Sequence, residues 1–241
     1  MERSHREPST VFSMRLTIFD YGAGNLHSLA KALEGDGVEV RVEDDALRAL
    51  DGDALVLPGV GAFQQAAERL APARERVRDA LLAGLPCLGV CLGMQLLFDE
   101  SEEGPGAGLG VIPGRVTRLH ARRVPQIGWN ELEAVVRADD PLFRRAPLRV
   151  AYFANSYACR PAASTGDSPV IAWATHEDDR FAAAVRAGNT VGVQFHPEKS
   201  SRDGVAFVQA WVAEARKLRA VPPATGSSPR TESGPSTESR S

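Results

Sequence analysis

The pentapeptide at residues 89–93, Gly-Val-Cys-Leu-Gly, constrains the fold of this chain more than any other segment. The apolar run Pro86–Val90 before the cysteine is typical of a buried strand, and Leu92–Phe98 predicts the start of a helix. Gly-x-Cys-x-Gly between a strand and a helix is the cysteine form of the nucleophile elbow, whose flanking glycines permit a sharp turn. We therefore expect Cys91 to stand above the end of a sheet, at the positive end of a helix that favours its thiolate.

Strand and helix patterns alternate through the first half of the chain. This order predicts an α/β fold with a parallel central sheet and helices on both of its faces. Besides the strand before Cys91, the predicted strands are 15–20, 38–42 and 53–57, and the predicted helices are 26–33, 63–70 and 74–83.

The second half of the chain changes character after a glycine-rich loop at residues 104–110. Its short apolar runs predict a smaller antiparallel or mixed β section that packs on the parallel half. Residues 202–219 predict a final helix, because their apolar side chains recur along one stripe. The predicted strands are 114–119, 124–129, 148–153, 170–175, 181–186 and 190–195.

Length and composition indicate one domain with polar ends. A chain of 241 residues that is 43% hydrophobic suits one α/β domain, which we expect at 14–220. We expect residues 1–13 and 221–241 to be disordered tails, because both are polar and aperiodic. The net charge of −3 indicates no broad surface for nucleic acid or membrane. With no signal peptide and no spanning apolar run, we expect a cytoplasmic protein.

The three cysteines do not have the spacing of a disulfide framework or of a metal site. Cys87 lies within the predicted buried strand and Cys159 follows another strand, so we interpret both as small apolar core residues. The sequence therefore predicts no bound metal, and it leaves Cys91 as the candidate nucleophile.

A candidate base and its carboxylate follow the last predicted strand. His196 comes directly after the apolar run 190–195, which would hold the imidazole at the carboxyl end of a strand. Glu198 lies two residues further on, across a proline that stiffens the pair. The order Cys91, His196, Glu198 predicts a triad in which the carboxylate orients the imidazole and the imidazole activates the thiol.

A candidate oxyanion hole follows another strand, at Pro58–Gly61. Its glycines can turn backbone N–H groups toward a ligand, and the N–H of Leu92 is the second expected donor. Each motif alone is more often a core cysteine, a surface turn or a plain loop. Their joint occurrence at strand ends of one α/β chain favours catalysis.

These motifs resemble those of class I, or triad, glutamine amidotransferases, and the resemblance extends over residues 14–219. Within that class the chain is most similar to the glutaminase subunits of imidazole glycerol phosphate synthase. The class motifs are 58–61, 89–95 and 194–200, and the subfamily motifs are 20–26, 57–63, 124–130 and 152–157.

The resemblance implies that Cys91, His196 and Glu198 hydrolyse L-glutamine to glutamate and ammonia through a γ-glutamyl thioester on Cys91. It implies neither a metal nor an organic cofactor. It would place Gly59, Gly61 and Leu92 around the oxyanion, and Met94, Gln95, Ser156 and Tyr157 near the glutamine.

The resemblance also implies a partner. Ammonia would pass, shielded from water, into a cyclase subunit with a (β/α)₈ barrel, which makes imidazole glycerol phosphate and AICAR in histidine biosynthesis. Trp129, Asn130 and Lys199 would face this subunit.

The chain departs from the family at two positions. It has Gln126 and Asn155 where the family commonly has histidine. Neither belongs to the triad, and both amides keep hydrogen-bonding capacity but lose a titratable ring. The departures therefore bear on coupling to the partner more than on glutamine hydrolysis.

Three other functions stay open from the sequence. The chain could be the glutaminase of another synthase, such as one making a purine, a pyrimidine precursor, anthranilate or pyridoxal phosphate, although the block 124–130 argues against that. It could also be an esterase of the α/β-hydrolase type, or a regulatory subunit without catalysis.

Overall fold

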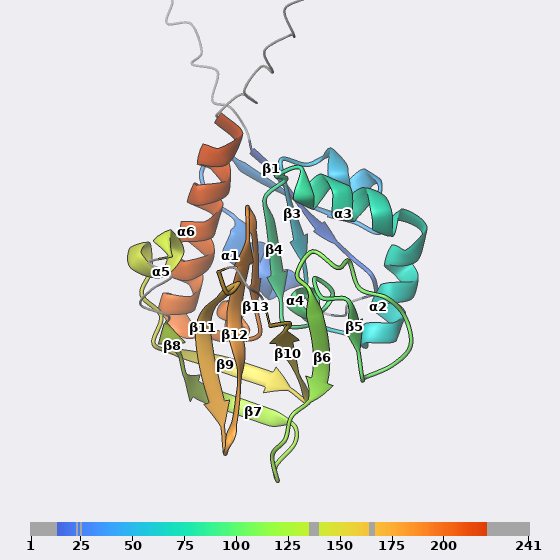
Figure 1. Ribbon diagram of the computed structural model, residues 1–241. Coiled ribbons are helices and arrows are strands. Elements are labelled where there is room, and N and C mark those ends of the chain that lie inside the picture. Colours follow the sequence, from blue (N-terminus) through green and yellow to red (C-terminus); the bar gives the residue numbers. More distant parts are fainter. Residues whose placement is uncertain (1–13, 23, 25, 135–139, 164–166, 221–241) are drawn as a thin grey trace, which may run out of the picture.

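Two strands from opposite halves of the chain lie side by side at the middle of the molecule. Strand β4 (Cys87–Val90) and strand β13 (Thr190–Val193) pair in parallel, with Val90 opposite Val193. Every residue of both strands is buried, as is usual for a parallel strand covered on both faces. Both strands end at the same edge of the sheet, so Cys91 and the segment that carries His196 emerge together (Figure 1).

The central sheet has eight strands in the order β2-β1-β3-β4-β13-β12-β11-β8. The first five in this order are mutually parallel, and the last three continue the sheet with antiparallel pairing. The remaining strands of the sheet are β1 (Met14–Phe19), β2 (Val38–Glu43), β3 (Ala54–Leu57), β8 (Glu133–Ala134), β11 (Val170–His176) and β12 (Asp179–Ala187).

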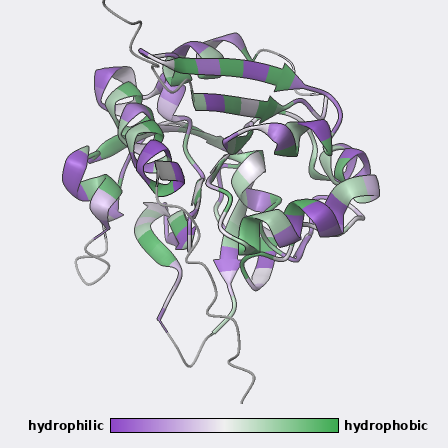
Figure 2. Cartoon of the chain, turned by 90° about the horizontal axis from the view of Figure 1, so that it is seen from above, coloured by the Kyte–Doolittle hydropathy of each residue, from purple (hydrophilic) through white to green (hydrophobic). Residues whose placement is uncertain are grey.

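Helices cover both faces of the sheet and form two hydrophobic layers (Figure 1). Hydrophobic and hydrophilic residues alternate along the helices (Figure 2), as expected when only one side of a helix packs against the core. One face is covered by α1 (His27–Leu33), α5 (Pro141–Arg145) and α6 (Ser201–Ala220), and the other by α2 (Phe63–Leu70) and α3 (Arg74–Leu82). Short 3-10 turns are η1 (Arg48–Asp51), η2 (Ala71–Ala73) and η4 (Pro197–Lys199).

Two small sheets complete the fold. One joins β10 (Tyr157–Pro161), β6 (Gly114–Arg118) and β5 (Glu100–Ser101). The other is an antiparallel ribbon of β7 (Gln126–Glu131) and β9 (Val150–Asn155), which lies beyond the carboxyl ends of β4 and β13 (Figure 1). The ribbon is tied to those ends because the N–H of His196 donates to the Tyr152 carbonyl at 2.8 Å.

The α/β class with its parallel core is confirmed, but the expected second β section is partly wrong. Strands β11, β12 and β13 do not pack on the parallel sheet; they extend it, and β13 is itself parallel to β4. The physical reason is that β4 has a second edge of backbone groups that must be paired once both its faces are covered. The short elements β5, β8, β10 and α5 were not predicted.

The helix after Cys91 is shorter than expected. Helix α4 (Leu92–Gln95) makes a single turn. It ends because the carbonyls of the next residues, 96–98, accept hydrogen bonds from the N–H groups of 109–112. A single turn has little macrodipole, so the helix field that we expected at Cys91 is weak.

The computed structural model describes residues 14–22, 24, 26–134, 140–163 and 167–220. The two tails expected at 1–13 and 221–241 lie outside the described residues. Within the described part of the chain, no helix combines the length and the apolar character that a membrane span requires.

Gly93 provides a test of how α4 is seated. A Cβ added there would overlap the carbonyl oxygen of Leu57 on β3, which is backbone and cannot rotate away. We predict that Gly93→Ala lowers the free energy of unfolding by about 3 kcal/mol, measured by urea denaturation. The matched control is Gly24→Ala, where an added Cβ meets nothing within 4 Å. Equal stability of the two variants would contradict this packing.

Candidate active site

Cys91 occupies a strained turn at the end of β4. Its φ of 47° and ψ of −104° are rare for a residue with a side chain. The conformation is held by a 2.7 Å hydrogen bond from the Cys91 N–H to the Val193 carbonyl at the end of β13. The elbow expected from the sequence is therefore present in the backbone, with the side chain 6% exposed.

His196 and Glu198 form a buried pair beside this turn. The ring Nδ1 of His196 lies 2.9 Å from Glu198 Oε1, so the other ring nitrogen is the one available to Cys91. Burial alone would lower the pKa of His196, but hydrogen bonds to Cys91 and Glu198, and the charges of both, raise it from 6.5 to about 9. The imidazolium is thus the favoured form at neutral pH, and it supplies the positive charge that α4 does not.

A serine that we did not single out from the sequence links the backbone of His196 to that of Tyr152. The hydroxyl of Ser200 donates to the His196 carbonyl at 2.7 Å and accepts the Tyr152 N–H at 2.9 Å. Ser200 is fully buried. A small hydroxyl at the end of the segment 194–200 was the only signal, and its role depends on Tyr152, which is remote in sequence.

The glycine loop after β3 lies against both reactive side chains. A Cβ on Gly59 would stand 3.0 Å from His196 Cε1 and 3.1 Å from Cys91 Cβ, so a side chain there would press on both residues. Gly61 has a φ of +123°, and a Cβ there would contact the Leu92 side chain at 3.4 Å. The Pro58 carbonyl at the start of the loop accepts a hydrogen bond from Tyr21. The loop and the N–H of Leu92 therefore flank Cys91.

Other residues expected near a glutamine ligand surround this turn in different ways. Met94 is fully buried in the core between α4 and the sheet. Gln95 is also buried, and its amide N–H groups donate to the Tyr157 carbonyl at 3.2 Å and to Gln194 at 3.4 Å. Ser156 and Tyr157 are half-buried at the start of β10.

Gln126 and Asn155 face each other across the ribbon as register partners of β7 and β9. Both side chains are buried, and their amide oxygens have no hydrogen-bond partner among the described residues. The Asn155 amide N–H donates to the Tyr157 carbonyl at 3.0 Å. Asn155 and Gln95 therefore share one acceptor.

The expected interface residues differ in exposure. Trp129 is 56% exposed and packs edge-on against Tyr152, with ring centroids 6.2 Å apart. Ile127, which we did not predict, is 68% exposed on the same face of β7. Asn130 is turned inward, because its amide donates to the Thr175 carbonyl at 2.9 Å. Lys199 is exposed on η4.

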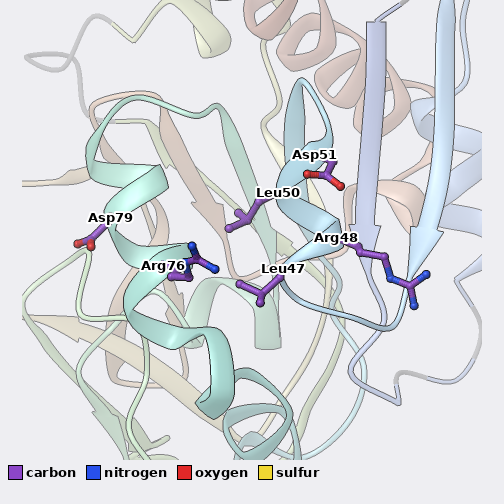
Figure 3. A pocket seen from close by; sticks show the side chains of 6 residues that line it. All are labelled: Leu47, Arg48, Leu50, Asp51, Arg76 and Asp79. Atoms are coloured by element: carbon purple, nitrogen blue, oxygen red, sulfur yellow. The ribbon is translucent and has the colours of Figure 1, made fainter.

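A surface pocket of about 560 Å³ lies away from this site, between η1 and α3 (Figure 3). Four of the six side chains that line it are charged, and the lining consists of Leu47, Arg48, Leu50, Asp51, Arg76 and Asp79. Among the described residues, no group of His, Cys, Asp or Glu side chains is arranged to hold a metal ion. Cys91, His196 and Glu198 lie together at the elbow, an arrangement that can support cysteine nucleophilic catalysis.

Comparison with known proteins identifies relatives of nearly full length. Residues 17–213 match the family described as glutamine amidotransferase class-I. The imidazole glycerol phosphate synthase subunit HisH of Acaryochloris marina is 40% identical over 216 residues, which cover 86% of this chain and 98% of the relative. The subunit HisH of Symbiobacterium thermophilum is 45% identical over 203 residues, which cover 82% and 92%.

A solved structure gives the same fold at low identity. PurLQS from Thermotoga maritima superimposes with a TM-score of 0.63 and 21% identity, over 84% of this chain and 99% of the matched chain. At this identity the likeness supports the architecture alone.

The raised pKa of His196 predicts how stability depends on pH. Between pH 6.5 and about 9 the folded protein holds this proton more tightly than the unfolded chain. The stabilisation by ionised His196 is therefore complete below pH 6.5 and is lost as the pH rises through about 9. Because Glu198 causes part of the shift, we predict that Glu198→Gln is less stable than the wild type below pH 6.5, and that this difference shrinks toward pH 9.

Urea denaturation across that pH range measures the effect. The control is Glu133→Gln. It removes an exposed carboxylate whose partner is Arg180 rather than a histidine. Its stability difference should stay flat with pH. A flat difference for Glu198→Gln as well would contradict the coupling.

Proposed function

This chain belongs to the class-I glutamine amidotransferase family, and we propose that it is the glutaminase subunit of an imidazole glycerol phosphate synthase. The observation that carries the proposal is the placement of Cys91 on a strained turn beside an imidazole that Glu198 holds. The relatives named as synthase subunits HisH support the choice of synthase. We also propose that residues 14–220 form the amidotransferase domain of a cytoplasmic protein.

In the proposed reaction, the Cys91 thiolate attacks the γ-carboxamide carbon of L-glutamine. The resulting oxyanion accepts hydrogen bonds from the N–H of Leu92 and from the loop of Gly59 and Gly61. Protonated His196 gives its proton to the leaving nitrogen, the C–N bond breaks, and ammonia and a γ-glutamyl thioester form. His196 then takes a proton from water, the hydroxide displaces the sulfur, and glutamate leaves with Cys91 and His196 restored.

The glutamine substrate is proposed to lie between α4 and the start of β10. Ser156 and Tyr157 are half-buried there and can meet a ligand with their side chains. Met94 is fully buried, so its contribution must come through the backbone. The amide N–H groups of Gln95 are already used, so this residue acts by fixing the Tyr157 backbone.

The partner is proposed to be a cyclase subunit with a (β/α)₈ barrel, which forms a heterodimer with this chain and receives its ammonia. The ribbon offers the docking face, because Ile127 and Trp129 are exposed apolar side chains on one side of β7. Trp129 packs on Tyr152, whose carbonyl holds the His196 N–H. Lys199 adds an exposed cation on η4, whereas Asn130 supports the ribbon from within.

The first test is covalent capture at Cys91. We predict that Cys91→Ala lowers glutamate release from glutamine on the order of 10⁴-fold or more, and that mass spectrometry finds a γ-glutamyl adduct on wild-type Cys91 only. Cys87→Ala is the control, because this thiol is on the same strand but its burial raises its pKa and keeps it inert. Turnover that survives Cys91→Ala would overturn the proposal.

The second test concerns the partner. We predict low glutaminase activity in the isolated chain, strong stimulation by the cyclase with its nucleotide ligand, and a Kd about thirtyfold weaker in Trp129→Ala. Leu82→Ala is the control, because Leu82 is 59% exposed on α3, at the opposite end of the molecule (Figure 1). High turnover without the cyclase, or an unchanged Kd for Trp129→Ala, would count against this arrangement.

A further inference from the structure

A buried amide that the triad does not include lies directly behind the nucleophile. Gln194 sits between the end of β13 and His196, and it is fully buried. Its amide Nε2 lies 3.5 Å from the Sγ of Cys91, which is hydrogen-bond distance for sulfur. The Gln194 side chain therefore contacts the sulfur of Cys91.

Two other donors fix which end of this amide meets the sulfur. The Gln194 Oε1 accepts from Gln95 Nε2 at 3.4 Å and from the thiol of Cys159 at 4.0 Å. If the amide were turned over, its NH₂ group would face these two donors, and its oxygen would face the sulfur lone pairs. Both contacts would then be lost, so the orientation with N–H toward Cys91 is selected by its surroundings.

The backbone gives this amide little freedom. The Gln194 N–H donates to the Ala183 carbonyl of β12 at 2.8 Å, so the residue continues the sheet for one position beyond β13. On the same strand, the Val193 carbonyl holds the N–H of Cys91. The nucleophile and its amide donor are therefore anchored to the same strand and cannot drift apart.

We propose that Gln194 is a positioning residue, whose amide N–H holds the Cys91 sulfur as a thiolate directed at His196. The importance of Gln194 for catalysis rests on the proposed function, whereas its hydrogen bond to the sulfur does not. A thiolate is a far better hydrogen-bond acceptor than a thiol, so a fixed donor stabilises the charged, nucleophilic form.

The other ionisable groups around the sulfur do not replace this donor. His196, backed by Glu198, is the group that meets Cys91 as a cation. Burial raises the pKa of Tyr21 and the pKa of Cys159, and the charge of Cys91 raises both further, so both stay neutral beside it. Gln194 and His196 are thus two separate hydrogen-bond partners of the sulfur.

The same hydrogen bonds connect the sulfur to the proposed glutamine pocket. Gln95 donates both to Gln194 and to the Tyr157 carbonyl, which also accepts from Asn155. One continuous amide network therefore runs from Cys91 to the residues that would surround a bound glutamine. Such a network would keep the position of the thiolate fixed relative to the pocket.

Alkylation of Cys91 by iodoacetamide in the full-length chain tests the proposal without glutamine or partner. Gln194→Met fills the same space but removes the donor, and we expect the second-order rate at neutral pH to fall about tenfold. The alkylation rate of the variant should also begin to rise only at a higher pH than that of the wild type. Adduct formation at Cys91 is followed by mass spectrometry, so the other two cysteines do not interfere.

The direction in which the alkylation rate changes distinguishes the loss of the Gln194 hydrogen bond from a loosened fold. Cys91 is only 6% exposed, so a loosened fold would admit the reagent and raise the rate. The control is Thr190→Val, which alters a fully buried polar side chain on the same strand and should leave the rate unchanged. If Gln194→Met does not fold, Gln194→Glu keeps both acceptor contacts and turns an oxygen toward the sulfur, and it must also slow alkylation.

An alkylation rate and pH profile of the folded Gln194 variant that match the wild type, or a faster rate, would overturn the proposal. Because the assay needs no turnover, a wild type that releases no glutamate even with the cyclase and its nucleotide ligand would refute the proposed function and still leave this inference open to its own result.

Discussion

The parallel pairing of β4 with β13 is the contact on which the site depends. It joins strands about a hundred residues apart in the chain, and it sets Val90 opposite Val193 at the edge where both strands end. The N–H of Cys91 bonds to the next strand at that edge, which holds the strained turn in place. Without this pairing, the cysteine and the histidine would have no common frame.

The electrostatics of the site follow from that frame. Helix α4 makes one turn, so the positive charge at Cys91 is that of His196, whose ring is held by the carboxylate of Glu198. Glu198 and Ser200 hold the imidazole by its ring and by its backbone, respectively. The amide of Gln194 lies within hydrogen-bond distance of the sulfur as well. The nucleophile thus lies between fixed groups in a buried setting, where such interactions are strong.

Local patterns predicted the parts of the structure that local physics determines. The apolar run before Cys91, the glycine loop after β3 and the strand before His196 each showed their type in a few residues. The sequence did not show that β11 to β13 extend the central sheet, because strand partners remote in sequence decide that. It overestimated α4, since N–H groups beyond the glycine-rich loop take the carbonyls that would continue the helix. Ser200, Gln194 and Ile127 lay within the matched motifs but received no role of their own, because their surroundings, not their residue types, give them importance.

NMR titration of the His196 imidazole in wild type and in Cys91→Ala tests the central claim most directly, because it measures the coupling that the paired strand ends create. The account predicts a midpoint near pH 9 in the wild type, and a clearly lower midpoint once the hydrogen bond and charge of Cys91 are removed. A wild-type midpoint at or below 6.5, or one that Cys91→Ala leaves in place, would contradict it.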